Sequence, residues 1–223
     1  MGTPIPTWKK WLSYLVAQEL ETASSSLNPH LEVQLNSGRI QLSTKNAVYS
    51  FEDRYTSFLR TFETLKIQQR EIISVLVLGF GFGSVPLMLR KNFEQHAPVI
   101  GVEIDPEVVR LFEKYRPKVL EDNLKIVSKD ALEFVESNAK QFDLVCVDLF
   151  LDEIVPAKFD TAEFLEPLRN TVSPKGLLLF NRMTSSDKLF KKTEVFRKGQ
   201  FNDVFPNAEF VDTGGNRVLV WKR

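Results

Sequence analysis

Val75-Leu76-Val77-Leu78-Gly79-Phe80-Gly81-Phe82-Gly83, residues 75–83, is a continuous apolar run that breaks into three alternating glycines. A strand that is apolar on both faces belongs inside a parallel sheet covered by helices. Glycines at the carboxyl end of such a strand let the backbone turn tightly and approach a bound nucleotide. The run therefore predicts a nucleotide-binding strand and loop, with Gly79, Gly81 and Gly83 at the ligand.

A lone acidic residue, Glu103, follows about one βαβ unit later, after the apolar residues 97–102. A carboxylate at that strand end can accept hydrogen bonds from both hydroxyls of a ribose. The dinucleotide fingerprint requires its third glycine where Ser84 stands, whereas here the glycine comes one residue earlier, at Gly83. The loop also has no arginine or lysine for a phosphate. A nucleoside sulfonium therefore fits this loop better than NAD.

Composition narrows the possible classes of protein. The chain has 223 residues and is 43% hydrophobic, which is enough for one packed core. The chain has 29 basic and 29 acidic residues, so it has no excess positive charge with which to bind nucleic acid. The single cysteine, Cys146, has no disulfide partner and indicates a reducing, cytoplasmic location. We find no bilayer-spanning apolar stretch and no signal peptide at the start, and expect no membrane role.

Alternating strands and helices are predicted from Ile72 onward. Strands are expected near residues 72–78, 99–103, 124–127, 142–148 and 176–181, and helices near 85–93, 107–115, 131–137, 162–172 and 187–198. Residues 209–212 and 217–221 flank two glycines and predict a terminal antiparallel hairpin. The pattern indicates an α/β fold with a Rossmann-like, doubly wound, seven-stranded and mostly parallel sheet.

The first 70 residues are predicted to form a helix and β-hairpin appendage, and residues 71–223 the nucleotide-binding domain. Thr7 can cap a first helix whose apolar stripe must dock on its own sheet or on a second subunit, so a homodimer is one expectation. Residues 22–29 are predicted as a loop. Residues 31–35 and 40–42 alternate around a turn and predict a hairpin. Helical spacing predicts a further helix between Phe51 and Leu65.

Several motifs, in this order, resemble the class I S-adenosylmethionine-dependent methyltransferase fold, and more closely its spermidine synthase-like, or polyamine aminopropyltransferase, family. The resemblance covers about residues 31–183 and rests on residues 75–83, 102–106 (VEIDP), 127–131 (VSKDA), 142–148 (FDLVCVD) and 172–178 (VSPKGLL). It implies S-adenosylmethionine, or its decarboxylated form, as co-substrate. The two histidines, His30 and His96, have no cysteine or acid at metal-binding spacing, so no metal is expected.

The resemblance also implies roles for the residues that would hold the donor. Glu103 would bind the ribose hydroxyls, Asp130 the adenine amino group with the Ala131 amide beside it, and Ile104 would press on the adenine ring. Alternatives remain, because Asp130 can cap the helix that begins at Ala131 and Ile104 can be a core residue. Phe80 lies in the glycine loop with the donor-binding glycines. It can cover the ligand or fill space beneath the N-terminal segments, and the same alternatives hold for Phe82.

The chemistry is expected at Asp148, which ends the fourth strand of the predicted sheet. In the aminopropyltransferases an aspartate at this place removes a proton from the attacking amine. A second acid nearby anchors the far ammonium group of the diamine, a role for Asp152 or Glu153, while Glu52 closes the pocket from the N-terminal side. The alternative for Asp152 and Glu153 is an exposed acidic turn.

Three departures from the family pattern bear on the substrate. The usual Asp-x-x-Asp is one residue longer here, Phe82 replaces an aspartate that holds the aminopropyl amine, and Phe51-Glu52 replaces a tyrosine–glutamine pair. Phe82 and Phe150 would favour a sulfonium through cation–π contact and an apolar acceptor. We therefore expect methyl transfer to an unidentified small-molecule acceptor. The alternatives are aminopropyl transfer to a polyamine and a nucleoside-binding protein without catalysis.

Overall fold

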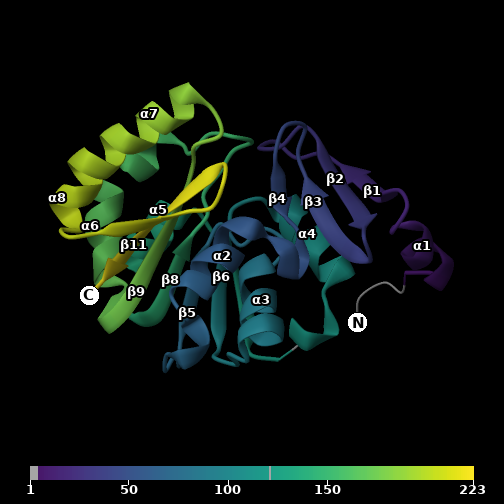
Figure 1. Cartoon of the computed structure of the whole chain (residues 1–223), viewed down its shortest axis with the longest axis horizontal. Coiled ribbons are helices and arrows are strands. Elements are labelled where there is room, and N and C mark those ends of the chain that lie inside the picture. Colours follow the sequence, from purple (N-terminus) through teal and green to yellow (C-terminus); the bar gives the residue numbers. More distant parts are fainter. Residues whose placement is uncertain (1–4, 121) are drawn as a thin grey trace.

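The computed structural model describes residues 5–120 and 122–223, so the expectation about the start of the chain falls partly on residues 1–4, outside the described residues. Two sheets organise the molecule (Figure 1). The larger has seven strands in the order β10-β11-β9-β8-β5-β6-β7, and the smaller has four in the order β1-β2-β3-β4. The larger sheet confirms the predicted doubly wound fold.

The seven strands follow the predicted sequence of elements closely. Strands β5 to β9 pair in parallel, whereas β11 lies antiparallel to β9 and β10 antiparallel to β11, as predicted for the terminal hairpin. Their bounds are β5 (Val75–Leu78), β6 (Val99–Glu103), β7 (Leu124–Ser128), β8 (Phe142–Val147), β9 (Val172–Met183), β10 (Glu209–Asp212) and β11 (Asn216–Lys222).

Helices cover both faces of this sheet, and β5 shows why its apolar run has to be continuous. Val75 and Val77 point into one buried cluster, while Leu76 and Leu78 point into the other. The first cluster includes residues of α3 (Ser84–Phe93) and α4 (Pro106–Tyr115), and the second includes residues of α5 (Ala131–Ser137), α6 (Ala162–Asn170) and α7 (Asp187–Phe196). The chain continues from α7 through a π-helical segment (Arg197–Phe201) into α8 (Asn202–Val204).

The strand order reverses direction beside β5. The chain moves from β5 to β6 and β7 on one side, then returns to β8 on the other side of β5. In open α/β sheets, ligands bind outside the carboxyl ends of the strands at such a switch point. The glycine loop follows β5 and Asp148 follows β8 at this point, so a ligand site is expected there.

The N-terminal region forms a sheet that was only partly predicted. The predicted hairpin is present as β2 (Leu31–Asn36) and β3 (Arg39–Ser43), whereas β1 (Gln18–Ala23) replaces part of the predicted loop and β4 (Val48–Ser50) adds an edge. Strand β1 is polar and is fixed by a distant contact, because the Glu21 carboxylate accepts hydrogen bonds from α4. A local apolar pattern could not reveal it.

A short helical segment, η1 (Glu52–Arg54), connects β4 to α2 (Thr56–Thr64), so the second predicted helix begins later than expected. Single-turn segments also occur at Ile67–Gln69, Lys118–Leu120 and Ala157–Asp160. The apolar side chains of β2 belong to the same buried cluster as Val75 and Val77 of β5. The N-terminal sheet is thus packed onto the larger sheet through a shared core.

The first helix, α1 (Thr7–Leu12), is shorter than predicted, and Pro6 rather than Thr7 occupies its N-cap position. The predicted apolar stripe remains in solvent, because Trp8 and Trp11 of α1 are 61% and 74% exposed and Leu15, beyond the end of α1, is 87% exposed. Contrary to one of the two expectations, the stripe does not dock on the described part of the same chain. None of the helices within residues 5–120 and 122–223 is long and apolar enough to cross a membrane.

Candidate active site

A cavity of about 650 Å³ opens at the switch point of the large sheet. Gly79, Gly81 and Glu103 line it from the ends of β5 and β6, and Asp148 lines it from the end of β8. Residues of the segment 47–59 line it from the N-terminal region. The cavity thus gathers two of the three predicted glycines, the predicted ribose acid and the predicted catalytic aspartate, whereas Gly83 lies outside its lining, beside Phe80 and Phe112.

The glycine loop is tightly folded and holds Glu103 in place. Gly79, Gly81 and Gly83 all have left-handed backbone angles, with φ of 79°, 54° and 75°. The Gly81 amide donates to Glu103 Oε2 at 2.9 Å, and the Asp105 amide donates to Glu103 Oε1 at 3.1 Å. Burial raises the pKa of the Glu103 carboxyl above its usual value. The carboxylate is oriented by backbone, and its remaining lone pairs are available to ligand hydroxyls.

The predicted adenine-binding residues also line the cavity, namely Ile104, Asp130 and Ala131. Asp130 is at the same time the N-cap of α5, because its Oδ1 accepts from the Leu132 amide at 2.9 Å. Its other oxygen pairs with Lys158. The capping alternative for Asp130 is therefore present in the structure, and its contact with adenine stays a prediction.

Asp148 lies beside the glycine loop, and its amide donates to the Leu78 carbonyl at 2.8 Å. Its Oδ1 accepts a hydrogen bond from Asn181 Nδ2 at 2.8 Å and a longer one from the Tyr55 hydroxyl at 3.4 Å. Burial raises the pKa of the Asp148 carboxyl to about 7, and the negative charge of Glu103 adds to this, while the two hydrogen bonds oppose it. A carboxylate with such a pKa is suited to accept a proton near neutral pH.

Asn181 and Tyr55 are site residues that the sequence analysis missed. The Asn181 side chain is fully buried on β9, and its Oδ1 accepts from Asn216 Nδ2 at 3.0 Å, which turns its amide nitrogen toward Asp148. One signal was available, since Asn181 is a polar residue directly after the apolar run 177–180 of a neighbouring strand. Tyr55 gave no such signal, because it fits the apolar spacing of the predicted helix.

Asp152 lines the cavity, but the N-terminal sheet already engages its carboxylate. Oδ1 accepts from the Thr44 hydroxyl at 2.7 Å, and Oδ2 accepts from Asn46 Nδ2 at 2.6 Å. These hydrogen bonds hold the pKa of Asp152 below its usual value although burial opposes them. Asp152 thus joins the loop after β8 to the β3–β4 turn.

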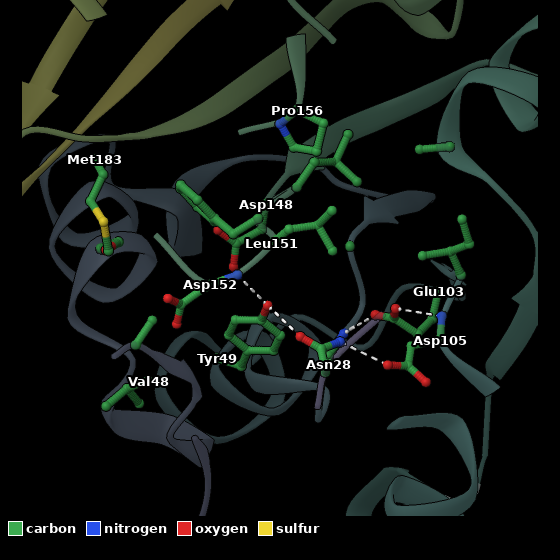
Figure 2. A pocket seen from close by; sticks show the side chains of 18 of the residues that line it. Asn28, Val48, Tyr49, Glu103, Asp105, Asp148, Leu151, Asp152, Pro156 and Met183 are labelled. Atoms are coloured by element: carbon green, nitrogen blue, oxygen red, sulfur yellow. Dashed lines mark hydrogen bonds between the residues drawn. The ribbon is translucent and has the colours of Figure 1, made fainter. Parts of the chain in front are cut away.

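A series of hydrogen bonds crosses the cavity wall from Asp152 to Asp105 (Figure 2). The Asp152 amide donates to the Tyr49 hydroxyl at 2.6 Å, and that hydroxyl donates to Asn28 Oδ1 at 2.9 Å. Asn28 Nδ2 in turn donates to Asp105 Oδ2 at 2.7 Å. Burial raises the pKa of Tyr49 to about 12, so its hydroxyl keeps the proton that it donates. The N-terminal region therefore connects the loops after β8 and β6.

Besides Gly83, four residues predicted to contact a ligand lie outside the cavity lining. Phe80 and Phe82 are buried and pack edge-on against Phe112 of α4, with ring centroids 4.9 and 6.1 Å away, and neither lines the cavity. Phe80 points there because Gly101 has no side chain to occupy the space. Glu52 accepts from the Ile40 amide at 2.9 Å and pairs with Lys91, also outside the cavity lining.

The fourth of these residues is Glu153, which is exposed and lies outside the lining, whereas Phe150 does line the cavity. These positions agree with the alternatives stated for the three residues. Phe80 and Phe82 fill space in the core, and Glu153 belongs to an exposed turn. Within the described residues, no group of three or more histidine, cysteine, aspartate or glutamate side chains is arranged to hold a metal ion.

The sheet order, the glycine loop and the acid after the second strand define the class I S-adenosylmethionine-dependent transferase fold. The sequence profile of the spermine/spermidine synthase domain matches residues 52–211, which is more than half of the chain. The chain belongs to this family.

Curated relatives include two kinds of transferase. A polyamine aminopropyltransferase of Vibrio vulnificus is 29% identical over 150 residues, covering 66% of this chain and 49% of the relative. An eEF1A lysine and N-terminal methyltransferase homolog of Drosophila melanogaster is 30% identical over 141 residues, covering 59% of this chain and 20% of the relative. The matches thus span half or less of these relatives.

Solved structures show the same fold. A probable spermidine synthase from Corynebacterium glutamicum has a TM-score of 0.70 at 22% identity, covering 93% of this chain and 80% of the other. The human methyltransferase-like protein 13, solved in complex with SAH, has a TM-score of 0.61 at 22% identity, covering 74% of this chain and 81% of the other.

Proposed function

We propose that this chain transfers a methyl group from S-adenosylmethionine to an amine of a small-molecule acceptor, with Asp148 as general base. One observation carries the proposal: a carboxyl group whose pKa is about 7 lines the cavity directly beside the glycine loop. An ammonium acceptor must lose a proton before its nitrogen lone pair can attack, and a base with a pKa near the working pH is effective for that step.

The proposed reaction needs no metal or further reactant. Asp148 takes one proton from the acceptor ammonium, and the nitrogen lone pair forms a bond to the methyl carbon. The carbon–sulfur bond breaks, and its electron pair neutralises the sulfonium to a thioether. The same steps describe aminopropyl transfer, with a methylene carbon in place of the methyl. The choice between the two reactions depends on what else the cavity binds.

Two features favour methyl transfer. A diamine acceptor requires a second carboxylate for its far ammonium group, but both oxygens of Asp152 already accept hydrogen bonds from Thr44 and Asn46. The cavity lining is also largely apolar, which favours an acceptor with an apolar body; it includes Leu27, Val48, Phe51, Leu59, Leu149, Phe150, Leu151, Phe159 and Met183.

Aminopropyl transfer to a polyamine is the second candidate, supported by the family match and by the Vibrio relative. We expect turnover with S-adenosylmethionine and an amine acceptor, and none with the decarboxylated donor and putrescine, measured by release of the thioether nucleoside. Turnover only with the decarboxylated donor would contradict methyl transfer. Absence of both turnover and nucleoside binding would contradict any transferase role.

The pH dependence of the reaction tests Asp148 as the base. Because the deprotonated form is the active one, kcat/KM should be low below the pKa of about 7 and rise as the pH increases through it. The Tyr55 hydrogen bond lowers this pKa, so Tyr55→Phe should move the inflection to higher pH while keeping the aromatic ring. Titration of the acceptor is the same for both proteins, so the difference between the two profiles reports on Asp148. Coincident profiles would remove Tyr55 as a positioning residue.

A further inference from the structure

Three cationic side chains line the cavity within the described residues: Arg54, Lys129 and Lys158. Lys158 forms an ion pair with Asp130, and Lys129 donates to the Ser137 hydroxyl at 3.0 Å. The Arg54 guanidinium has no ion pair or hydrogen bond to any residue of 5–120 and 122–223. Arg54 is also exposed, which places it at the mouth of the cavity. Among the described residues, Arg54 is thus the one cavity-lining cation without a protein partner.

The amides of the two loop glycines that line the cavity, Gly79 and Gly81, are already engaged. Gly79 and Phe80 donate their amides to the Val102 carbonyl at 3.0 Å, and Gly81 donates to Glu103. The Gly83 amide donates to the Phe80 carbonyl at 3.1 Å. An anionic group of a ligand beside Gly79 and Gly81 therefore needs a partner other than their amides.

Arg54 comes from the element that faces this loop. The Phe51 amide donates to the Ser84 hydroxyl at 3.0 Å, which fixes the start of η1 at the beginning of α3. The residue after Arg54 is Tyr55, whose hydroxyl reaches Asp148. Arg54 is thus carried by a segment anchored at the glycine loop on one side and at the proposed base on the other.

The geometry of a sulfonium donor indicates which part of the donor would lie near Arg54. Its sulfur carries the adenosyl group, the methyl group and the amino-acid chain. With the adenosyl group toward Glu103 and the methyl group toward Asp148, the amino-acid chain points to the remaining side, which residues 47–59 line. We propose that Arg54 binds the carboxylate of the amino-acid chain and thereby selects intact S-adenosylmethionine over its decarboxylated form.

This inference rests on the proposed function and can be tested separately from it by binding calorimetry. The two donors differ only in the carboxylate. We expect the native protein to bind S-adenosylmethionine about tenfold more tightly than the decarboxylated form, the size expected for charge-assisted hydrogen bonds at a partly exposed site. Arg54→Gln should abolish that preference. Methylthioadenosine, which lacks the amino-acid chain, should bind both proteins about equally, which would also show that the variant is folded.

Lys45→Gln is the matched control, because Lys45 is an exposed cation on the β3–β4 turn and does not line the cavity. This variant should keep the preference for S-adenosylmethionine. If Arg54→Gln also keeps it, Arg54 is not the carboxylate partner and methyl transfer stands. If the native protein prefers the decarboxylated donor, the methyl-donor proposal is wrong. An equal loss of affinity for methylthioadenosine in Arg54→Gln would overturn the carboxylate assignment.

Discussion

Asp148→Asn should lower kcat by about 10² to 10⁴, the range expected when a general base is removed. Asparagine keeps the shape of the side chain, and its oxygen can still accept from Asn181, but its amide cannot accept a proton from the substrate. Donor affinity should therefore remain close to that of the native protein. The measurement is single-turnover methyl transfer together with calorimetric binding of S-adenosylmethionine.

Asp143→Asn is the matched control for this variant. Asp143 lies on the same strand, β8, and its carboxylate accepts from Ser173, Ser74 and the Ile73 amide, outside the cavity lining. These contacts hold the pKa of Asp143 below its usual value, so the substitution should reduce stability and leave kcat nearly unchanged. Native turnover in Asp148→Asn would exclude Asp148 as the base.

Gly79→Ala should have the largest effect on folding. A β-carbon at this position would overlap the backbone of Asp148 and lie 2.7 Å from its carbonyl carbon. Backbone atoms of a central strand end cannot move aside, and the φ of 79° is itself unfavourable for alanine. We expect a loss of about 2 to 4 kcal/mol in the free energy of unfolding, measured by chemical denaturation without ligand.

Gly81→Ala separates the effect of steric overlap from the effect of the positive φ angle. Gly81 also has a positive φ, of 54°, but an added β-carbon would make only ordinary contacts, 3.5 Å from the Tyr49 carbonyl oxygen. The free energy of unfolding should then fall by only about 1 kcal/mol, which is the cost of the left-handed backbone conformation for alanine. Equal destabilisation by the two substitutions would show that backbone conformation, rather than the approach of Asp148, requires glycine at residue 79.

Position along a strand was enough to predict that four residues meet at one cavity, while their ligand and catalytic roles stay predictions. Gly79, Gly81, Glu103 and Asp148 each follow an apolar strand, and parallel strands bring their carboxyl ends to one edge. The positions of the two loop phenylalanines could not be predicted in this way, because alternation along the loop does not say which side chain enters the core. Phe80 and Phe82 turn toward Phe112, a ring on the following helix.

Local periodicity and general rules of chain connection were enough to predict the sheet, its mostly parallel order and the acids at its strand ends. The contacts that complete the site, in contrast, become visible only in the folded chain. Tyr55 meets Asp148 across 93 positions of sequence, and Tyr49 meets Asp152 across 103. Such contacts depend on how the N-terminal sheet packs over the switch point, and no short stretch of sequence encodes that packing.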